Sequence, residues 1–308
     1  MEGRWVEVAD RVLVRRYAEL DLSVGLVMGD DGCLVVDTRG DERQGAELLA
    51  EVRRITRAPW TVAITHSHFD HSFGTRSFLG CPVWAHEDCR TDLIENGGRA
   101  RDEWEHHYRD LLGRPDIADD IARTEIVPPD HLVTDRTRLV VGGRPIVLAH
   151  LGRGHSGNDL VVHVPDAGVI FAGDLVENGA PPAYEDAYPL EWPATLAGLL
   201  SLLDPPASPD GPGGTAVSRD ATVCAPHPGG TARHGHTAGP HPGGTIVPGH
   251  GDPVDRAFVV AQHAEISALA LLCERVAEGL LSPADAVRLS PYPEETTEIA
   301  LGRAAGHR

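Results

Sequence analysis

Three histidines and one aspartate lie within six positions of the chain, in the segment HSHFDH. They are His66, His68, Asp70 and His71, and they directly follow the apolar run WTVAI at 60–64. Neutral imidazole and carboxylate groups bind zinc, and three or four such ligands surround each ion. Since His66 and His68 alternate along the chain, both can reach one ion, while Asp70 and His71 can reach a second. The segment therefore predicts part of a two-metal site of the kind that catalyses hydrolysis.

Three further candidate ligands follow short apolar segments elsewhere in the chain. His155 lies in GRGHSGND, just after PIVLAHL; Asp174 ends VIFAGD; and His250 lies in TIVPGHG. Loops beyond strand ends, held by a rigid sheet, are places where side chains from distant segments converge. Asp37 also ends an apolar segment, LVVDT, and we expect it either to support a metal ligand or to cap a turn.

The segments HSHFDH, GHSGND, FAGD and VPGHG resemble, in this order, the metallo-β-lactamase superfamily of metallohydrolases over roughly residues 5–260. The resemblance implies an α/β fold, the four-layer αβ/βα metallo-β-lactamase sandwich, with a dinuclear site at one edge between two sheets. It also implies one ion on His66, His68 and His155. The second ion would be held by Asp70, His71 and His250, with Asp174 bridging the two ions.

Two positions narrow this resemblance to certain branches of the superfamily. Asp174 is similar to the bridging aspartate of the glyoxalase II-like, lactonase and ribonuclease Z-like branches, whereas the zinc β-lactamases proper have a cysteine or serine there. His68 distinguishes the chain from the flavodiiron oxygen reductases, whose motif is similar to HxExDH and has a glutamate at this position. A glyoxalase II-like use of glutathione is not supported, because the residues after His250 contain no lysine.

The expected function is that of a dinuclear zinc-dependent hydrolase. Two Zn²⁺ ions per chain, with iron or manganese as other metals, would lower the pKa of a bound water from 15.7 to about 7. The resulting metal-bound hydroxide would attack an acyl substrate such as a thioester, a lactone or a related ester or amide. Asp70 is the expected catalytic residue that orients this nucleophile, and no GxSxG nucleophile elbow occurs in the sequence.

Two other functions stay open on the sequence alone. One is a mononuclear iron oxidoreductase similar to the persulfide dioxygenases of the superfamily, which keep the same residues. The other is a non-catalytic binding protein on the same fold. The identity and amount of bound metal would distinguish the three.

Aromatic residues near the motif segments are candidates for substrate contact. Phe69 lies inside HSHFDH and is expected at the mouth of the pocket. The segment 176–192 follows Asp174 and contains Tyr184 and Tyr188, which are expected in one wall of the pocket. The polar, helical segment 87–124 is expected to form a lid.

The pattern of apolar residues predicts a mixed α/β chain. Strands are expected within 5–37, at 60–64, 137–143 and 145–151, and as a hairpin over 159–174. Helices are expected at 41–57, 191–203 and 257–281, and a last helix begins at 282 with Ser282 as its cap.

We expect a single domain over 1–308, ending in helices at 257–308. It contains a flexible insertion at 204–245 that is rich in proline and glycine. Histidines also occur in this insertion, but no apolar run frames them, so a metal site is not expected there. They are His227, His234, His236 and His241.

Composition limits the partners. The net charge of −19 disfavours binding to nucleic acid and to anionic membranes. The sequence contains no apolar run of 18 residues, so no transmembrane helix is expected. The five cysteines form no CxxC pair and no signal peptide is visible, so we expect reduced thiols in the cytoplasm. The expected partner is a small acyl substrate, and a homodimer is left open.

Overall fold

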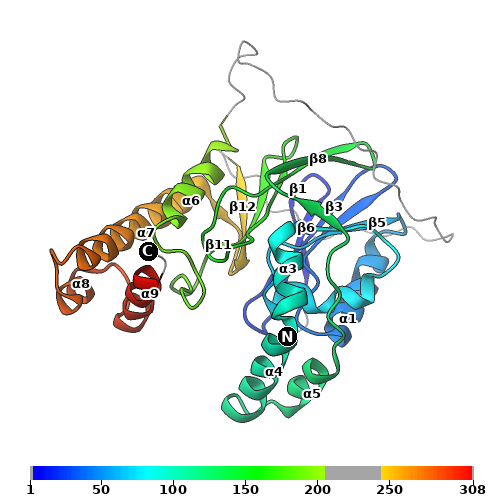
Figure 1. Ribbon diagram of the computed structural model, residues 1–308. Helices are drawn as coiled ribbons and strands as arrows, with labels where there is room; N and C mark the ends of the chain where they lie inside the picture. The colour runs from blue at the N-terminus through cyan, green and yellow to red at the C-terminus, as the bar shows by residue number, and fades with distance from the viewer. Residues whose placement is uncertain (1–2, 205–243, 307–308) are drawn as a thin grey trace.

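Two β-sheets face each other, and helices cover the outer face of each sheet (Figure 1). The computed structural model describes residues 3–204 and 244–306. Valine, leucine and isoleucine side chains from both sheets fill the space between them, including Val14, Leu34, Leu148 and Val162. The fold is therefore the four-layer α/β sandwich that the resemblance implies.

The first sheet has its strands in sequence order. They are β1 (Trp5–Ala9), β2 (Val12–Arg16), β3 (Ser23–Met28), β4 (Cys33–Val36), β5 (Trp60–Ala63), β6 (Val83–His86) and β7 (His131–Val133). Strands β1 to β4 pair antiparallel, whereas β4 to β7 pair parallel. The carboxyl ends of the parallel strands meet at one edge, which is where the motif HSHFDH begins.

The second sheet has the order β13-β12-β11-β10-β9-β8. Its strands are β8 (Arg136–Val141), β9 (Arg144–Ala149), β10 (Val161–Val164), β11 (Val169–Glu177), β12 (Thr245–His250) and β13 (Val254–Asp255). Strands β10 and β11 form the expected hairpin, and β11 pairs parallel with β12. This parallel pair carries Asp174 and His250 toward the same edge of the sheet.

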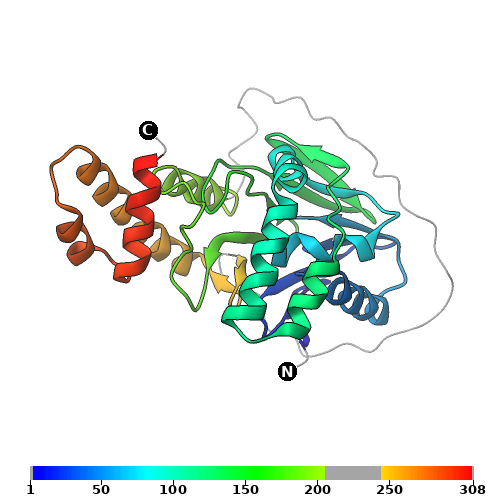
Figure 2. The same cartoon turned by 60° about the horizontal axis from the view of Figure 1, so that its bottom comes forward.

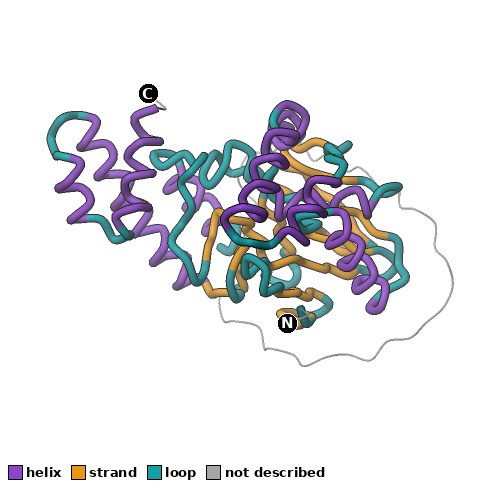
Figure 3. Tube along the Cα trace, turned by 90° about the horizontal axis from the view of Figure 1, so that it is seen from below, coloured by secondary structure: helices purple, strands orange, loops and turns teal. Residues whose placement is uncertain are grey.

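Helices cover the outer faces in two groups (Figure 2). The first sheet is covered by α1 (Glu42–Ile55), α2 (Phe69–Ser72), η1 (Phe73–Phe78), α3 (Glu87–Glu95), α4 (Gly97–His106), η2 (His107–Leu111) and α5 (Pro115–Arg123). The second is covered by α6 (Trp192–Ser201) and α7 (Arg256–Ala277). Helix α9 (Glu294–Gly306) packs on α7, and α8 (Pro283–Leu289) packs on both α7 and α9. Figure 3 shows the C-terminal helices gathered at one end of the molecule.

The ends of several helices follow local signals in the sequence. Asp41 caps α1 by accepting from the N–H of Gln44, and Ser282 caps α8 by accepting from Asp285. Helix α9 is the exception, because the sequence pattern predicts α8 as the last helix. Its polar and apolar residues do not separate into distinct faces, so it lacks the pattern of an amphipathic helix.

Helix α7 is long and apolar enough, by composition alone, to cross a membrane. Val259, Ile266, Leu269 and Cys273 on this helix are buried in the core beneath the second sheet. Packing within the protein therefore accounts for their apolar character. The expected insertion at 204–245, with its four histidines, lies outside the described residues except at its two ends.

Candidate metal centre

The motif HSHFDH spans the loop after strand β5 and the start of the single-turn helix α2. His66 and His68 belong to the connecting loop, and Asp70 and His71 lie in the turn that begins at Phe69. Backbone hydrogen bonds from His71 and Ser72 back to the carbonyl of His68 close this turn. The chain reversal brings all four potential ligands to the edge where the two sheets meet.

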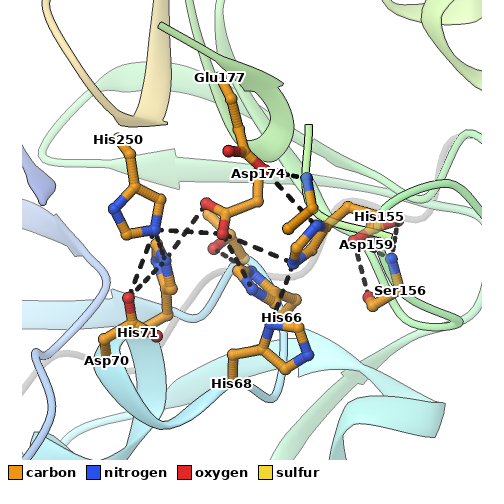
Figure 4. Close-up of polar contacts among 12 residues, drawn as sticks. His66, His68, Asp70, His71, His155, Ser156, Asp159, Asp174, Glu177 and His250 are labelled. Atoms are coloured by element: carbon orange, nitrogen blue, oxygen red, sulfur yellow. Dashed lines mark hydrogen bonds and ion pairs between the residues drawn. The ribbon is translucent and has the colours of Figure 1, made fainter. Parts of the chain in front are cut away.

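The first group of potential ligands consists of His66, His68, His155 and Asp174, whose ligand atoms lie within 4.8 Å of one another (Figure 4). His155 Nε2 is 2.9 Å from His68 Nδ1 and 3.5 Å from Asp174 Oδ2. His66 Nε2 lies 3.7 Å from the same carboxylate oxygen. Three imidazoles and one carboxylate therefore converge on one point.

The second group consists of Asp70, His71 and His250, again with ligand atoms within 4.8 Å. His250 Nε2 is 3.3 Å from Asp70 Oδ2 and 3.2 Å from Asp174 Oδ2. His71 Nε2 is 3.2 Å from Asp174 Oδ1. Asp174 thus contacts both groups, as a bridging carboxylate must.

The chemistry of these donors fits divalent metal ions. His66 is 1% exposed, and its Nε2 has no hydrogen-bond partner among the described residues although it faces Asp174. A buried polar atom without a partner is costly, and a metal ion would satisfy it. Imidazole nitrogen and carboxylate oxygen are ligands that zinc prefers.

The sequence model of the metallo-beta-lactamase superfamily matches residues 20–209, which is more than half of the chain. The chain belongs to the metallo-beta-lactamase superfamily. The match includes the motif HSHFDH, His155 and Asp174, and it ends before His250.

Individual relatives are more distant. The acyl-coenzyme A thioesterase MBLAC2 of Gallus gallus is 27% identical over 51% of this chain and 58% of its own length. The metallo-beta-lactamase type 2 of Bacillus cereus is 24% identical over 58% of this chain and 61% of its own. The chain therefore spans less than two thirds of the length of these relatives.

Solved structures of the superfamily confirm the fold. The metallo-beta-lactamase FIM-1 from Pseudomonas aeruginosa, in its mono-zinc form, aligns with a TM-score of 0.59 at 16% identity. The alignment covers 88% of this chain and 97% of that protein. Many members of the superfamily are metal-dependent hydrolases, and the two ligand groups described above form a possible metal site.

A buried aspartate bonds to the candidate ligand His71 on the side of the ring that faces away from the ligand groups. Asp37 Oδ2 accepts from His71 Nδ1 at 2.8 Å, and the Asp37 carboxylate also accepts from the N–H and hydroxyl of Thr65. Asp37 is 2% exposed and has a left-handed backbone with φ 66°. Of the two roles expected for Asp37, these contacts fit support of the candidate ligand His71.

Two other histidines, His250 and His68, are also oriented through the ring nitrogen that faces away from the ligand group. His250 Nδ1 bonds to the carbonyl of Leu20 at 2.7 Å. His68 Nε2 bonds to Asp186 Oδ2 at 2.9 Å. These contacts leave His250 Nε2 and His68 Nδ1 directed at the ligand groups.

Burial controls the protonation of two of the histidines. Burial lowers the pKa of His66 well below its ordinary value and lowers the pKa of His155 to about 4. Both imidazoles are therefore neutral at pH 7, which is the form that binds a metal.

Carboxylates have the opposite effect on the other three histidines. Burial acts to lower the pKa of His68, His71 and His250, but neighbouring carboxylates outweigh it. Asp174 and Asp70 raise the pKa of His250 to about 10 and that of His71 well above its ordinary value. The pKa of His68 is raised to about 9.

Two acidic residues at the centre were missed by the sequence analysis. Glu177, the last residue of β11, is 7% exposed and has its Oε1 3.8 Å from His155 Nδ1; burial and Asp174 raise its pKa to about 8. Asp186 lies in the segment expected as a pocket wall, where an acidic residue between two tyrosines gives no signal of metal support.

The candidate substrate residues lie in different surroundings. Phe69 is 3% exposed and stacks on Trp104 at 4.1 Å, so it packs in the core instead of facing the pocket mouth. Tyr184 is 1% exposed and packs against Trp192. Tyr188 is half-buried and stacks with Arg153, and its contact with substrate stays a prediction.

Proposed function

We propose that the protein is a dinuclear metal-dependent hydrolase that cleaves an acyl substrate, with a thioester or lactone as the first class to test. The supporting observation is Asp174, which contacts histidines of both ligand groups. A carboxylate in this position can hold two ions at the spacing of about 3.5–4 Å used in two-metal hydrolysis. We propose zinc as the metal.

Metal ions held by these residues would lower the pKa of a water molecule and polarise the carbonyl of the substrate. His66, His71 and His155 are enclosed by protein, whereas the side chains of His68 and His250 are 30% and 19% exposed. Substrate therefore approaches from the side of His68 and His250.

Asp70 is the proposed catalytic carboxylate. Its side chain is 10% exposed, and its Oδ2 lies 3.3 Å from His250 Nε2, at the more open side of the centre. In this position it can accept a hydrogen bond from the attacking water and orient it toward the carbonyl carbon. Geometry of this kind contributes to hydrolysis by positioning the reactants.

The substrate class rests on two arguments. A relative that is 27% identical is an acyl-coenzyme A thioesterase, which supports a thioester. Asp174 is similar to the bridging aspartate of the superfamily branches that hydrolyse thioesters and lactones. A β-lactam is therefore a weaker candidate. All three classes belong in the same assay.

The test compares hydrolysis of thioester, lactone and β-lactam panels by the purified protein, by protein treated with a chelator and by protein reloaded with zinc. The proposal predicts hydrolysis of at least one acyl class, its loss on chelation and its return with zinc. Hydrolysis that survives complete removal of metal would contradict it. A single iron per chain, with oxygen consumed in the presence of a persulfide, would replace it by the oxidoreductase alternative.

A further inference from the structure

His68 is the least enclosed histidine of the metal centre. Its side chain is 30% exposed, whereas those of His66, His71 and His155 are 1%, 0% and 3% exposed. Packing on all sides holds a buried ring in one orientation. A ring that borders solvent needs a specific partner to hold it in one rotamer.

Asp186 is that partner. The hydrogen bond from His68 Nε2 to Asp186 Oδ2 is 2.9 Å long, and on the other side of the ring Nδ1 lies 2.9 Å from His155 Nε2. A proton held on Nε2 by a carboxylate leaves the lone pair of Nδ1 directed at the first ligand group. Asp186 therefore fixes both the tautomer and the orientation that a metal requires.

Asp186 belongs to a segment with no helix or strand, which connects β11 to α6 over residues 178–191. Its side chain is 54% exposed, so packing does not hold it. Its backbone is held by the C-terminal helix α9: Arg303 Nη2 donates to the carbonyl of Asp186 at 2.7 Å, and Arg303 Nε donates to that of Ala187 at 3.2 Å. The planar guanidinium suits two neighbouring acceptors.

We propose that Asp186 is a positioning residue for the first metal group, and that Arg303 of α9 holds Asp186 in place. The C-terminal helices are then part of the metal centre, although no residue in them is a ligand. This inference rests on the proposed function in one respect, namely that the first ligand group binds a metal ion.

The test measures zinc binding rather than activity. Metal-free wild type and Asp186→Ala are titrated with zinc against a competing chelator, and two dissociation constants are fitted. Loss of a carboxylate that orients a ligating histidine weakens metal binding by about 10–100-fold. We expect this loss at one site, with the other site changed by less than about threefold.

Two variants in the same segment separate positioning from loop structure. Asp186→Asn keeps an oxygen that can accept from His68 Nε2, so its affinity should lie closer to wild type than that of Asp186→Ala. Glu185→Ala removes the neighbouring exposed carboxylate and should bind zinc as wild type does. Wild-type affinity in Asp186→Ala would overturn the inference, and so would an Asp186→Asn variant as weak as Asp186→Ala.

The role of Arg303 is tested in the same titration. Arg303→Met keeps most of the aliphatic stem but removes both donors, and it should weaken the same site in the same direction as Asp186→Ala. Arg288→Met, on the neighbouring helix α8, is the matched control, because Arg288 is exposed and pairs within its own helix. An unchanged zinc affinity in Arg303→Met would overturn the role of α9. A wild-type protein that binds no zinc would overturn the proposed function as well.

Discussion

His71 and His68 belong to adjacent ligand groups, and each bonds to an aspartate through its remote ring nitrogen, but the two aspartates lie in different surroundings. Asp37 is 2% exposed and directly follows β4, where the parallel register of β4 and β5 places it beside Thr65. Asp186 is more than half exposed and depends on a helix over a hundred residues further along the chain. The second group is thus supported by the sheet, and the first partly by a loop and the C-terminal helices.

The two ligand groups are therefore supported in two different ways, one by a sheet edge and the other by a loop. Support from a sheet edge is rigid, because it forms together with the hydrophobic core. Support from a loop depends on contacts that can be removed without disturbing that core. The two groups should therefore respond differently to substitution, pH and packing.

Replacing the shared ligand should have the largest effect, because it removes the element common to both groups. Asp174→Ala is expected to lose both metals and to reduce hydrolysis by about a thousandfold or more, measured as kcat/KM together with metal content. The control is Asp31→Ala, which removes an exposed carboxylate in a turn. Retention of both metals by Asp174→Ala would show that the groups do not share this carboxylate.

Replacing Asp37 should affect both the fold and the second group. Asp37→Ala leaves the buried donors of Thr65 and His71 without an acceptor and places alanine in a left-handed conformation, which together should cost about 2–4 kcal/mol of unfolding free energy. Denaturant unfolding measures this cost.

Asp37→Asn separates the effect on stability from the effect on zinc binding. The amide keeps one oxygen for the N–H of Thr65 and tolerates the left-handed backbone, but its nitrogen cannot accept from His71 Nδ1. Stability should recover more than zinc affinity at the second group does. Equal recovery of both would indicate that Asp37 acts on the fold alone.

The pH dependence of zinc binding should differ between the groups. The pKa of His71 and of His250 is raised in the second group, whereas in the first group only that of His68 is raised. Each protonated imidazole must lose its proton before it binds zinc, so affinity should rise with pH. At pH 7 the second group should therefore release more protons per ion than the first.

Calorimetric titration in buffers of different ionisation enthalpy counts these protons. Replacing His106, an exposed histidine on α4, should leave both proton counts unchanged. Equal proton release from the two groups would contradict the electrostatic difference between them.

A smaller effect is expected from packing behind the bridging carboxylate. A Cβ at Gly249 would overlap Asp174 Oδ1, so Gly249→Ala should displace Asp174 and cost about 1–3 kcal/mol of stability. Gly98→Ala is the control, because Gly98 is exposed on α4 and a Cβ there would meet no other atom within 4 Å. This substitution should stabilise the protein by up to about 1 kcal/mol. Thermal melting of both variants measures the difference, and an unchanged melting temperature in Gly249→Ala would contradict the close packing.

The parts of this centre that the sequence could predict are those with local signals. Four potential ligands lie within HSHFDH, and His155 and His250 follow or end an apolar strand. Asp174 ends an apolar segment of the sequence, but strand β11 continues beyond it to Glu177. Ser282 caps its helix as expected, because a capping side chain bonds within its own turn, and Asp41 caps α1 in the same way.

Residues that act through tertiary contacts could not be found in this way. Asp186 and Arg303 meet only because the loop after β11 packs against α9, and α9 itself lacks an amphipathic pattern. For Phe69 a local signal in the sequence predicted the wrong surroundings. Its position inside a metal motif suggested a place at the pocket mouth, but the turn of α2 directs it into the core beside Trp104. Side-chain direction in a short turn depends on packing that the sequence does not display.

The most direct test of the account is the number of zinc ions bound per chain, measured by native mass spectrometry as metal-free protein is titrated with zinc. A dinuclear centre bridged by Asp174 should give a species with one ion and then a species with two, with both lost in Asp174→Ala. Saturation at one zinc per chain, or two zinc ions retained by Asp174→Ala, would contradict a dinuclear centre bridged by Asp174.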